Sequence, residues 1–497
     1  MIFNNSQASL QAAVLSALNG SSSSLRTDLR SDTRIYVGNM LSLVEIADRM
    51  RKGPMMTAKE WDVALFRKMS ELAKEFDLKC PNEPSNWINT DDSLADAAWQ
   101  AAVKFVVEMG CLCLDRERVV KFTEEEVREA VRSMQREVVM GEGKDARVWR
   151  QHRVEGTEPL NVSPGHHAPF TEDLANTVVQ NFATIPRLDF LEGFNFPLID
   201  GYEIYGTPLE AYASKRQVAW LREGIRKAGR PGAAIVYYPI STAASSFLAT
   251  IDPVAGLRPT DGVLLSVLPD VKVQYDLITA ALVLQSHGYF GISGSFGIVG
   301  GFAGGPEGAI IEGLAKTIIA WMVYRDNLYY NGVEHFSHIS GVKRCMFPIS
   351  FARSVVYQAT IRNSNGIPMH WPIPVSELCT ESHLEELILR SVEATVNGAN
   401  LYVPRVSRSR MNGGQTPADA ELMIEASDAA IRTRIKRSEV YPMFKPVITK
   451  LMANPNPEPG KLITECYDLQ RHKPSSEYQE LIARVKNEFR DCGLQWE

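Results

Sequence analysis

From about residue 185 onward, short apolar runs alternate with longer segments that have helical spacing. This pattern predicts strands buried on both faces, each followed by a helix. The predicted strands are Ile235–Tyr238, Val263–Leu268, Tyr289–Ser293, Val333–His338, Ile367–Trp371 and Leu401–Val403, with Tyr202–Tyr205 as a further candidate. The predicted helices are Leu209–Ala228, Val273–Ser286, Glu307–Tyr324, Ser350–Arg362, His383–Val396 and Pro417–Arg434.

About seven β/α units in one unbroken series favour an α/β fold, a (β/α)8 TIM barrel, over an open doubly wound sheet. No G-x-G-x-x-G follows a predicted strand, so the sequence does not support a dinucleotide-binding fold. No Walker loop, G-x-S-x-G or H-E-x-x-H is present either, which leaves hydrolase and metalloprotease readings without support.

The N-terminal half predicts a layer of helices. Thr57-Ala-Lys-Glu60 reads as a capping box, and Trp61, Leu65, Met69 and Leu72 then form one apolar stripe. Further helices are predicted over Ser93–Met109 and, behind the N-cap Thr123, over Thr123–Val139. We therefore expect a flexible or partner-bound arm over 1–40, a helical layer and lead-in over 41–184, and a TIM-barrel catalytic domain with C-terminal helices over 185–497.

Composition narrows the class of partner. The formal net charge is −6 and the pI is about 6.0, which argues against nucleic acid as the main partner. Seven cysteines without a C-x-x-C fit reduced thiols, and no signal peptide is visible, so we expect a cytoplasmic protein. Leu277–Pro306 has no Asp, Glu, Lys or Arg, but its eight glycines predict a buried helix, a strand and a glycine loop rather than a membrane span.

In a TIM barrel the active site lies at the C-terminal ends of the strands. The candidates there are Tyr237, Tyr238, Asp270, Ser293, Ser295, His335, His338, His370, Trp371 and Arg405. His335 and His338 would point to opposite faces of a strand, so we expect no metal there and assign His335 alone a hydrogen-bonding or proton-transfer role. Glu377 lies in an apolar setting, where a carboxylate often has a shifted pKa.

Five stretches together resemble the monomethylamine corrinoid methyltransferases, the methanogen enzymes that use pyrrolysine. They are Gly141-Glu-Gly-Lys-Asp-Ala146, Ala228-Gly-Arg-Pro-Gly232, Gly300-Gly-Phe-Ala-Gly-Gly305, Ser376-Glu-Leu-Cys379 and Glu465-Cys-Tyr-Asp468. Their order and spacing also agree, and the resemblance covers about residues 45–496.

The resemblance implies a TIM barrel with a helical N-terminal layer, and a homo-oligomer. It implies that a methyl group moves from a small methylated substrate to the cobalt of a corrinoid (cobalamin) carried by a separate partner protein, with no metal bound directly by this chain. The glycine loop, with Gly300, Gly301, Gly304 and Gly305, is the part that we assign to contact with the corrinoid.

The departures from the family pattern concern the substrate. The place of pyrrolysine falls at Tyr237, with Val236 and Tyr238 left open. The family's acidic residue falls at Gly294 or Ser295, and its glutamine and tyrosine fall near Ile367 and Met369. We therefore do not expect monomethylamine to be the methyl donor.

The hypothesis that follows is a pyrrolysine-independent methyltransferase for a pre-activated donor, such as a methylated onium, or a halogenated or ether C1 compound. An aromatic pocket would bind a quaternary ammonium by cation–π contact. We assign catalytic roles to Tyr237, His335 and Glu377, and the substrate pocket to Tyr238, Phe296, His370, Trp371 and Asp270. Two alternatives stay open: a TIM-barrel enzyme that uses His335 with Glu377 or Asp270 as acid and base, and a non-catalytic homologue that binds a corrinoid protein.

Overall fold

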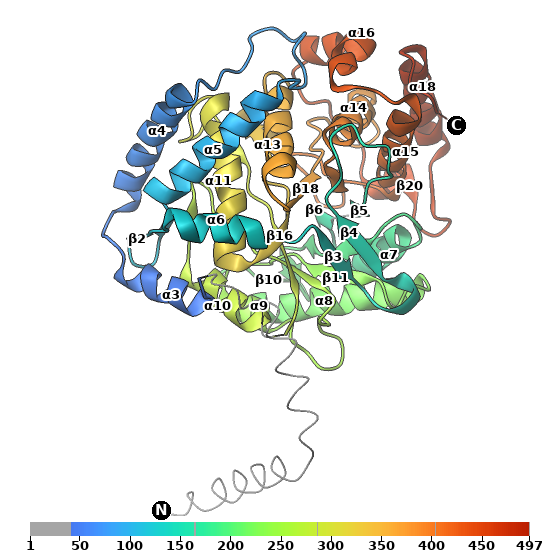
Figure 1. Cartoon of the computed structure of the whole chain (residues 1–497). Coiled ribbons are helices and arrows are strands. Elements are labelled where there is room, and N and C mark those ends of the chain that lie inside the picture. Colours follow the sequence, from blue (N-terminus) through green and yellow to red (C-terminus); the bar gives the residue numbers. More distant parts are fainter. Residues whose placement is uncertain (1–40, 164–165, 286, 403, 497) are drawn as a thin grey trace, which may run out of the picture. The chain divides into compact units, whose positions relative to one another are not determined.

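The computed structural model describes residues 41–163, 166–285, 287–402 and 404–496, without the side chains of residues 166 and 167. The arm expected over residues 1–40 lies outside the described residues. From Ser42 onward the chain forms one unit, in which helices surround a central sheet (Figure 1).

The sheet has eight parallel strands in the order β5-β19-β18-β16-β14-β12-β11-β7. They are β5 (Val162–Ser163), β7 (Phe190–Glu192), β11 (Ala234–Tyr237), β12 (Gly262–Leu264), β14 (Phe290–Ser293), β16 (Asp326–Tyr329), β18 (Ile367–His370) and β19 (Asn400–Tyr402). The amide of Asp189, just before β7, donates to the carbonyl of Val162 in β5 at 2.8 Å, which joins the two edges. The predicted TIM barrel is confirmed.

Each barrel strand is followed by a helix on the outside. These helices are α7 (Glu172–Ala183), α8 (Leu209–Lys227), α9 (Ala244–Leu248), α10 (Tyr275–Gln285), α11 (Pro306–Tyr324), α13 (Ile349–Asn363), α14 (Glu381–Asn397) and α15 (Pro417–Thr433). At the start of α15, Thr416 forms a capping box with Asp419, and Pro417 occupies the first turn.

The N-terminal helices cover one side of the barrel. They are α3 (Leu43–Lys52), α4 (Ala58–Glu75), α5 (Asp92–Glu108) and α6 (Glu124–Ser133). Helix α4 packs on α11, and α5 packs on both α11 and α13 (Figure 1). Thr57 and Glu60 form the expected capping box, and the predicted apolar stripe of α4 is fully buried.

A hairpin closes the N-terminal end of the barrel. Its strands are β3 (Glu137–Met140) and β4 (Arg147–Arg150), joined through the 3-10 turn η1 (Gly143–Asp145). Met140 and Trp149 pack into the barrel core, where the Trp149 ring lies 5.0 Å from the ring of Phe190. The cavity that receives substrate must therefore be at the other end.

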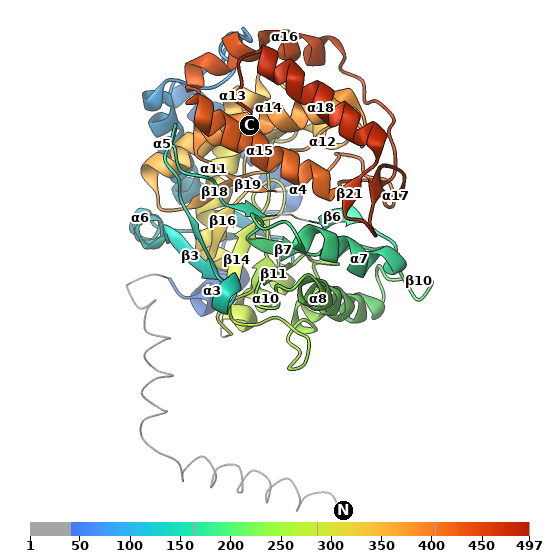
Figure 2. The ribbon, with the colours of Figure 1, turned by 90° about the vertical axis from the view of Figure 1, so that its right-hand side faces the viewer.

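The remaining elements complete the layers. Helices α16 (Val440–Ala453) and α18 (Ser476–Asp491) pack on α14 (Figure 2). The short elements are β1 (Cys111–Cys113), β2 (Arg118–Val120), β6 (His166–Pro169), β8 (Phe194–Asn195), β9 (Leu198–Ile199), β10 (Tyr202–Glu203), β13 (Lys272–Val273), β15 (Gly297–Val299), β17 (Val333–His335), α12 (Phe336–Ile339), η2 (Arg437–Glu439), α17 (Ile463–Cys466), β20 (Tyr467–Asp468) and β21 (Lys473–Pro474).

Two strand predictions were wrong. The barrel strand expected at 333–338 is β16, whereas β17 pairs with β15 outside the barrel. Helix α11 ends at Arg325 in a left-handed conformation, and β16 begins at the next residue with two buried polar side chains that hid it from the apolar pattern. Likewise, β10 forms a hairpin with β9 and is not a barrel strand.

The sequence reading also missed β5 and β7, which are too short to give a pattern. Because β5 belongs to the barrel, the barrel begins before the boundary expected at 184/185. The predicted helix over 123–139 ends at Ser133, and β3 follows.

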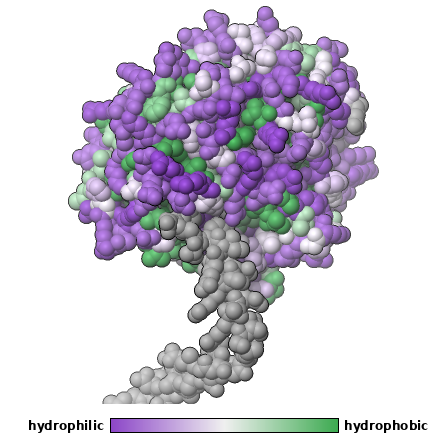
Figure 3. Space-filling model, in the orientation of Figure 1, coloured by the Kyte–Doolittle hydropathy of each residue, from purple (hydrophilic) through white to green (hydrophobic). Residues whose placement is uncertain are grey.

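In the part of the chain that the structure describes, no helix is long and apolar enough to cross a membrane. The face seen in Figure 3 is largely hydrophilic, with hydrophobic residues in scattered groups.

Candidate functional site

Alternation along β11 decides which side chains face the barrel interior. Val236 belongs to the barrel core and Tyr238 packs against it, whereas Tyr237 between them points outward. The Tyr237 hydroxyl lies 2.7 Å from that of Ser214 and accepts from the amide of Ile240, and its ring meets Phe247 edge-on at 5.5 Å. Tyr237 therefore holds α8 and the loop after β11 in place, and Tyr238 is the tyrosine that reaches the barrel mouth.

Four aromatic side chains gather at the C-terminal end of the barrel, and we call Phe296, Tyr330, Trp371 and Tyr402 the aromatic cluster. The rings of Tyr330 and Tyr402 stack at 4.8 Å, and Trp371 meets Tyr330 edge-on at 5.3 Å. Phe296 stacks on Trp371 at 5.8 Å. Each ring is locked by another, so the cluster is rigid before any ligand binds.

A cavity of about 470 Å³ opens beside this cluster. Tyr238, Phe296, Tyr330 and Trp371 form its aromatic wall. The rest of its lining comes from the loops after β11, β12 and β14, the end of β12, and residues of β15, α10 and α12: Pro239, Ile240, Ser241, Thr242, Leu264, Ser266, Val267, Leu268, Pro269, Leu277, Gly294, Ser295, Ile298 and Ile339. Among the residues that the structure describes, no Asp, Glu, Lys or Arg lines it, so it suits a small ligand with an apolar surface or a diffuse positive charge.

A buried carboxylate lies behind the aromatic wall. Glu192 ends β7 on the same side as the core residue Phe190, so its side chain points into the barrel. Its exposed fraction is zero, and burial raises its pKa well above the ordinary value. Its charge raises the pKa of Tyr238 and of Tyr330, after the larger effect of their own burial. A carboxylate therefore stands within electrostatic reach of the cavity.

Sequence reasoning missed Glu192, Tyr330 and Tyr402. The signal that could have found Glu192 is an acid in the otherwise apolar run Leu188-Asp-Phe-Leu-Glu192. An ionisable group at the end of a buried strand is a candidate site residue. Tyr402 lies in the predicted strand Leu401–Val403, and Tyr330 lies between a predicted helix and a predicted strand, so neither residue stood out.

Gly294, one of the two positions where we expect the family pattern to have an acid, shapes the cavity. A Cβ atom there would lie 1.5 Å from Cζ and 1.9 Å from the hydroxyl oxygen of Tyr330. The ring of Tyr330 thus occupies the space of any side chain at 294. No residue with a side chain, an acid included, fits at position 294 while Tyr330 keeps this place.

We expect Gly294→Ala to destabilise the fold by about 1–3 kcal/mol, because Tyr330 is held by Tyr402 and cannot yield without disturbing the cluster. Urea unfolding measures the loss. Gly301→Ala is the control for stability, since a Cβ at 301 meets nothing closer than 3.3 Å. Equal stability of the two variants would contradict the coupling between Gly294 and Tyr330.

Three of the predicted site residues lie outside the cavity lining. His335 caps α12, with Nδ1 accepting from the amide of Ser337 at 3.0 Å. Glu377 pairs with Arg410 at 2.6 Å and accepts from the amide of Gly460 at 2.9 Å. Asp270 lies 3.6 Å from Lys272, and burial raises its pKa. Because each has a different partner, they do not form one acid–base pair.

His370 also points away from the cavity, since Met369 and Trp371 on either side of it belong to the barrel core. Its Nδ1 lies 3.1 Å from the hydroxyl of Tyr357. Burial first, and then the charges of Arg353 and Arg390, lower its pKa well below the ordinary value, so it stays neutral. Its role in this structure is packing between β18 and α13.

The two arginines beside His370 belong to a buried ionic network. Glu334 pairs with both Arg353 and Arg390, the latter at 3.2 Å. Although burial opposes ionisation, these two guanidinium groups hold the pKa of Glu334 below its ordinary value. Glu386 pairs with Arg344 at 2.7 Å. The network fixes the segment after β16 onto α13 and α14.

His338 lies in the same network with both ring nitrogens engaged. Nδ1 accepts from the amide of Cys345 at 3.0 Å, so the proton is on Nε2, which donates to the carbonyl of Ile373 at 2.7 Å. Burial lowers its pKa to about 4. His338 thus positions two loops rather than a ligand.

Four of the five sequence motifs pair off. The amide of Glu142 donates to the carbonyl of Gly232 at 2.7 Å, and the Gly232 amide donates to Asp145 at 3.1 Å, which joins the first two motifs below the barrel. The neighbouring Cys466 thiol raises the pKa of the Cys379 thiol, so the last two motifs also lie side by side. These motifs hold the scaffold together.

The glycine loop lies between β15 and α11. Gly300 and Gly304 have φ of +88° and +82°, and the Gly300 amide donates to the carbonyl of Gly304 at 3.0 Å, so the loop needs glycine there. Phe302 at its tip is 49% exposed, and Phe336 nearby is 59% exposed. A side-chain-poor loop flanked by exposed aromatic rings is suited to contact with a flat partner surface.

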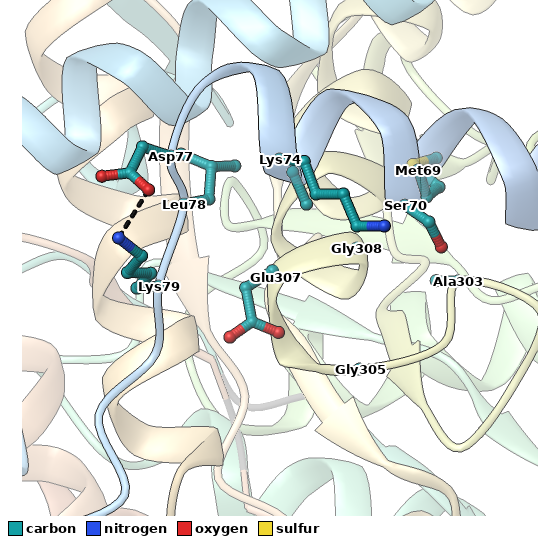
Figure 4. Close-up of a pocket in the computed structure, with 11 residues that line it drawn as sticks. Met69, Ser70, Lys74, Asp77, Leu78, Lys79, Ala303, Gly305, Glu307 and Gly308 are labelled. Atoms are coloured by element: carbon teal, nitrogen blue, oxygen red, sulfur yellow. Dashed lines mark ion pairs between the residues drawn. The ribbon is translucent and has the colours of Figure 1, made fainter.

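A second cavity, of about 380 Å³, lies on the outer side of this loop (Figure 4). Its walls come from α4, the segment after it and the start of α11, with Lys74, Lys79 and Glu307 at its edge. It shares no lining residue with the first cavity. The aromatic cavity at the barrel mouth is therefore the candidate active site.

A TIM barrel with an apolar, aromatic-walled cavity at the C-terminal ends of its strands and a buried carboxylate behind it defines the class: a barrel enzyme for a small organic substrate. The family model "Monomethylamine methyltransferase MtmB" matches residues 41–494. The chain therefore belongs to the MtmB family and is a methyltransferase.

Relatives and solved structures agree. Monomethylamine methyltransferase MtmB1 of Methanosarcina barkeri is 25% identical over 454 residues, which covers 90% of this chain and 97% of that protein. MtmB of Methanosarcina mazei is 25% identical over 453 residues, with the same coverage. The crystal structure of M. barkeri MtmB superposes with a TM-score of 0.83 at 24% identity, covering 91% of this chain and 98% of that chain.

Proposed function

We propose that this chain transfers a methyl group from a methylated onium, such as a quaternary ammonium, to the cobalt of a corrinoid carried by a partner protein, without pyrrolysine. The observation that carries the proposal is the cavity wall of Tyr238, Phe296, Tyr330 and Trp371 with the carboxylate of Glu192 behind it. Aromatic faces attract a diffuse cation, and a nearby carboxylate adds to that attraction.

The chemistry asks little else of the chain. When bound, the corrinoid supplies a cobalt nucleophile that accepts the methyl group. An onium nitrogen already carries positive charge, so it keeps the electron pair of the broken carbon–nitrogen bond and leaves as a neutral amine. The aromatic wall orients the methyl group toward the barrel mouth and keeps water away from it. No proton has to be delivered to the leaving group.

The place of pyrrolysine supports a changed donor. Tyr237 faces away from the cavity, and at the neighbouring inward positions stand Val236 and Tyr238, neither of which can bond covalently to an amine. Tyr330 occupies the space of an acid at 294. Gly300, Gly301, Gly304 and Gly305 stay our proposed contact with the corrinoid, and homo-oligomerisation stays a prediction.

The alternative enzyme, with His335 and Glu377 or Asp270 as acid and base, has no observation in its favour because these groups lie in separate contacts. The non-catalytic alternative predicts partner binding without turnover, so one turnover experiment separates it from our proposal.

The experiment mixes the purified chain with free cob(I)alamin and one donor at a time, and follows the visible absorbance of the cobalt. The donors are tetramethylammonium, trimethylsulfonium, monomethylamine, dimethyl ether and chloromethane. We expect methylation with the onium donors, at a rate at least 100-fold above that with monomethylamine. The proposal would be overturned if monomethylamine were the only donor that methylated the cobalt. It would also be overturned if none of the donors did so.

A further inference from the structure

One cation of the barrel mouth, Arg405, has no carboxylate beside it in the described part of the chain. Arg405 follows β19, and its guanidinium carbon lies 5.5 Å from the ring centre of Trp371, a residue that lines the aromatic cavity. The charge of the same guanidinium lowers the pKa of the Tyr238 and Tyr330 hydroxyls, in opposition to their burial. The guanidinium therefore lies near both rings. Arg405 therefore stands beside the aromatic wall.

The side chain of Arg405 is short of partners. Its Nε atom is buried and has no hydrogen-bond acceptor among the described residues, and no carboxylate of the described chain lies within ion-pair distance of its guanidinium. Burial lowers its pKa, which means that the surroundings give the charge little compensation. Even a partly buried charge without a counter-charge is costly, and Arg405 is partly exposed.

Arg405 is partly exposed, whereas three fully buried arginines of the barrel wall have carboxylate partners. Arg344 pairs with Glu386 at 2.7 Å, and Arg390 pairs with Glu334 at 3.2 Å. Arg353 pairs with Glu393 at 3.4 Å and also contacts Glu334. Arg405 has no such partner among the described residues, and its buried Nε is without an acceptor there, which points to an anion that arrives with the ligand.

We propose that Arg405 binds an anionic group, a carboxylate, of the methyl donor, so that the donor is a zwitterion with an onium at one end and a carboxylate at the other. This inference rests on the proposed function. The onium would contact the aromatic wall near Glu192, and the carboxylate would take both donors of one edge of the Arg405 guanidinium. Since Trp371 touches both subsites, the spacer between the two charges is short.

The arrangement also balances charge. A donor with a single positive charge would enter a cavity flanked by a carboxylate on one side and a guanidinium on the other, and the guanidinium would repel it. A zwitterion satisfies both groups at once. Complementarity of this kind selects among ligands by penalising the mismatched one.

The test compares trimethylammonioacetate with tetramethylammonium, two probes that share the onium and differ in the carboxylate. Binding to the full chain, without corrinoid, is measured by titration calorimetry. We expect trimethylammonioacetate to bind at least tenfold more tightly than tetramethylammonium. Arg405→Gln should remove this preference by weakening the binding of the zwitterion. The affinity for tetramethylammonium should stay unchanged or increase, because a repelling charge is gone.

Arg408→Gln is the matched control, since Arg408 is an exposed arginine of the same loop. Arg405→Lys keeps the charge without the planar fork, and should retain part of the preference; it also serves if Arg405→Gln fails to fold. Equal binding of the two probes to the unmodified chain, or an equal loss of both in Arg405→Gln, would overturn the inference.

Failure of this inference and failure of the proposed function can be told apart. Turnover of tetramethylammonium without any advantage for the zwitterion would refute the role of Arg405 and leave onium methyl transfer standing. Arg405-dependent binding of the zwitterion without methylation of cob(I)alamin by any donor would refute the methyl transfer and leave the binding site standing.

Discussion

Replacing Glu192 by glutamine is expected to weaken the binding of tetramethylammonium about 100-fold at alkaline pH. The carboxylate is buried beside the aromatic wall, where charge interactions are strong because water is excluded. Losing such a partner costs a bound cation roughly 2–3 kcal/mol, which corresponds to about 100-fold in affinity. Titration calorimetry of the unmodified chain and of Glu192→Gln gives the two constants.

The pH dependence provides an independent check. Burial raises the pKa of Glu192, so at lower pH its carboxyl is neutral and must lose a proton before it can pair with a cation. The affinity of the unmodified chain should therefore rise with pH, by up to tenfold per unit, until the pH passes that pKa. Glu192→Gln should lack this slope, and Glu83→Gln, at an exposed position, should keep it. Equal slopes in all three proteins would contradict the role of Glu192.

The same raised pKa makes a prediction for the free chain that controls for folding. A buried carboxyl that prefers to be neutral contributes stability at low pH and loses it as the pH rises through its folded pKa. Glu192→Gln should therefore be folded, and its stability should fall less steeply with rising pH.

Glu334→Gln is expected to lower the free energy of unfolding by about 3–5 kcal/mol, because it leaves Arg353 and Arg390 buried without their shared counter-charge. Urea unfolding at neutral pH measures the loss. The control is Glu137→Gln, which breaks a half-exposed pair with Arg150 at 3.8 Å and should cost less than about 1 kcal/mol.

The stability that Glu334 contributes should decrease as the pH falls. The folded-state pKa of Glu334 is lowered, so its stabilisation is present above its unfolded pKa and is lost as the pH falls through the folded value. The difference between the unmodified chain and Glu334→Gln should therefore shrink in acid. A difference that stays constant down to acid pH would show that packing, rather than charge, makes the contribution.

Much of the scaffold was predictable because its signals are local. The capping box at Thr57, the apolar stripe of α4 and the proline-started helix α15 depend on residues within a few positions of one another. The barrel was predictable from the repetition of strand and helix, even though β5 and β7 were missed and β16 was placed seven residues too late at Val333. Repetition tolerates errors in single elements, since the remaining units still indicate the fold.

The candidate site was less predictable, because a shift of one residue along a strand reverses the side that a side chain faces. The sequence could not decide which of Val236, Tyr237 and Tyr238 faces the site, and of these three only Tyr238 lines the cavity. His335 was assigned to a barrel strand and lies instead at the start of α12. Phe296 and Trp371, expected in the pocket, do line the cavity.

The sequence by itself thus determined the barrel, its helical layer and the family motifs, because helix caps, apolar periods and motif spacing act over short distances. Only the tertiary structure decided which groups meet at the mouth: Glu192 from β7, Tyr330 after β16 and Arg405 after β19. These residues are far apart in the chain, and each is ordinary by itself. Barrel closure brings the ends of distant strands together, and that contact is where the proposed chemistry arises.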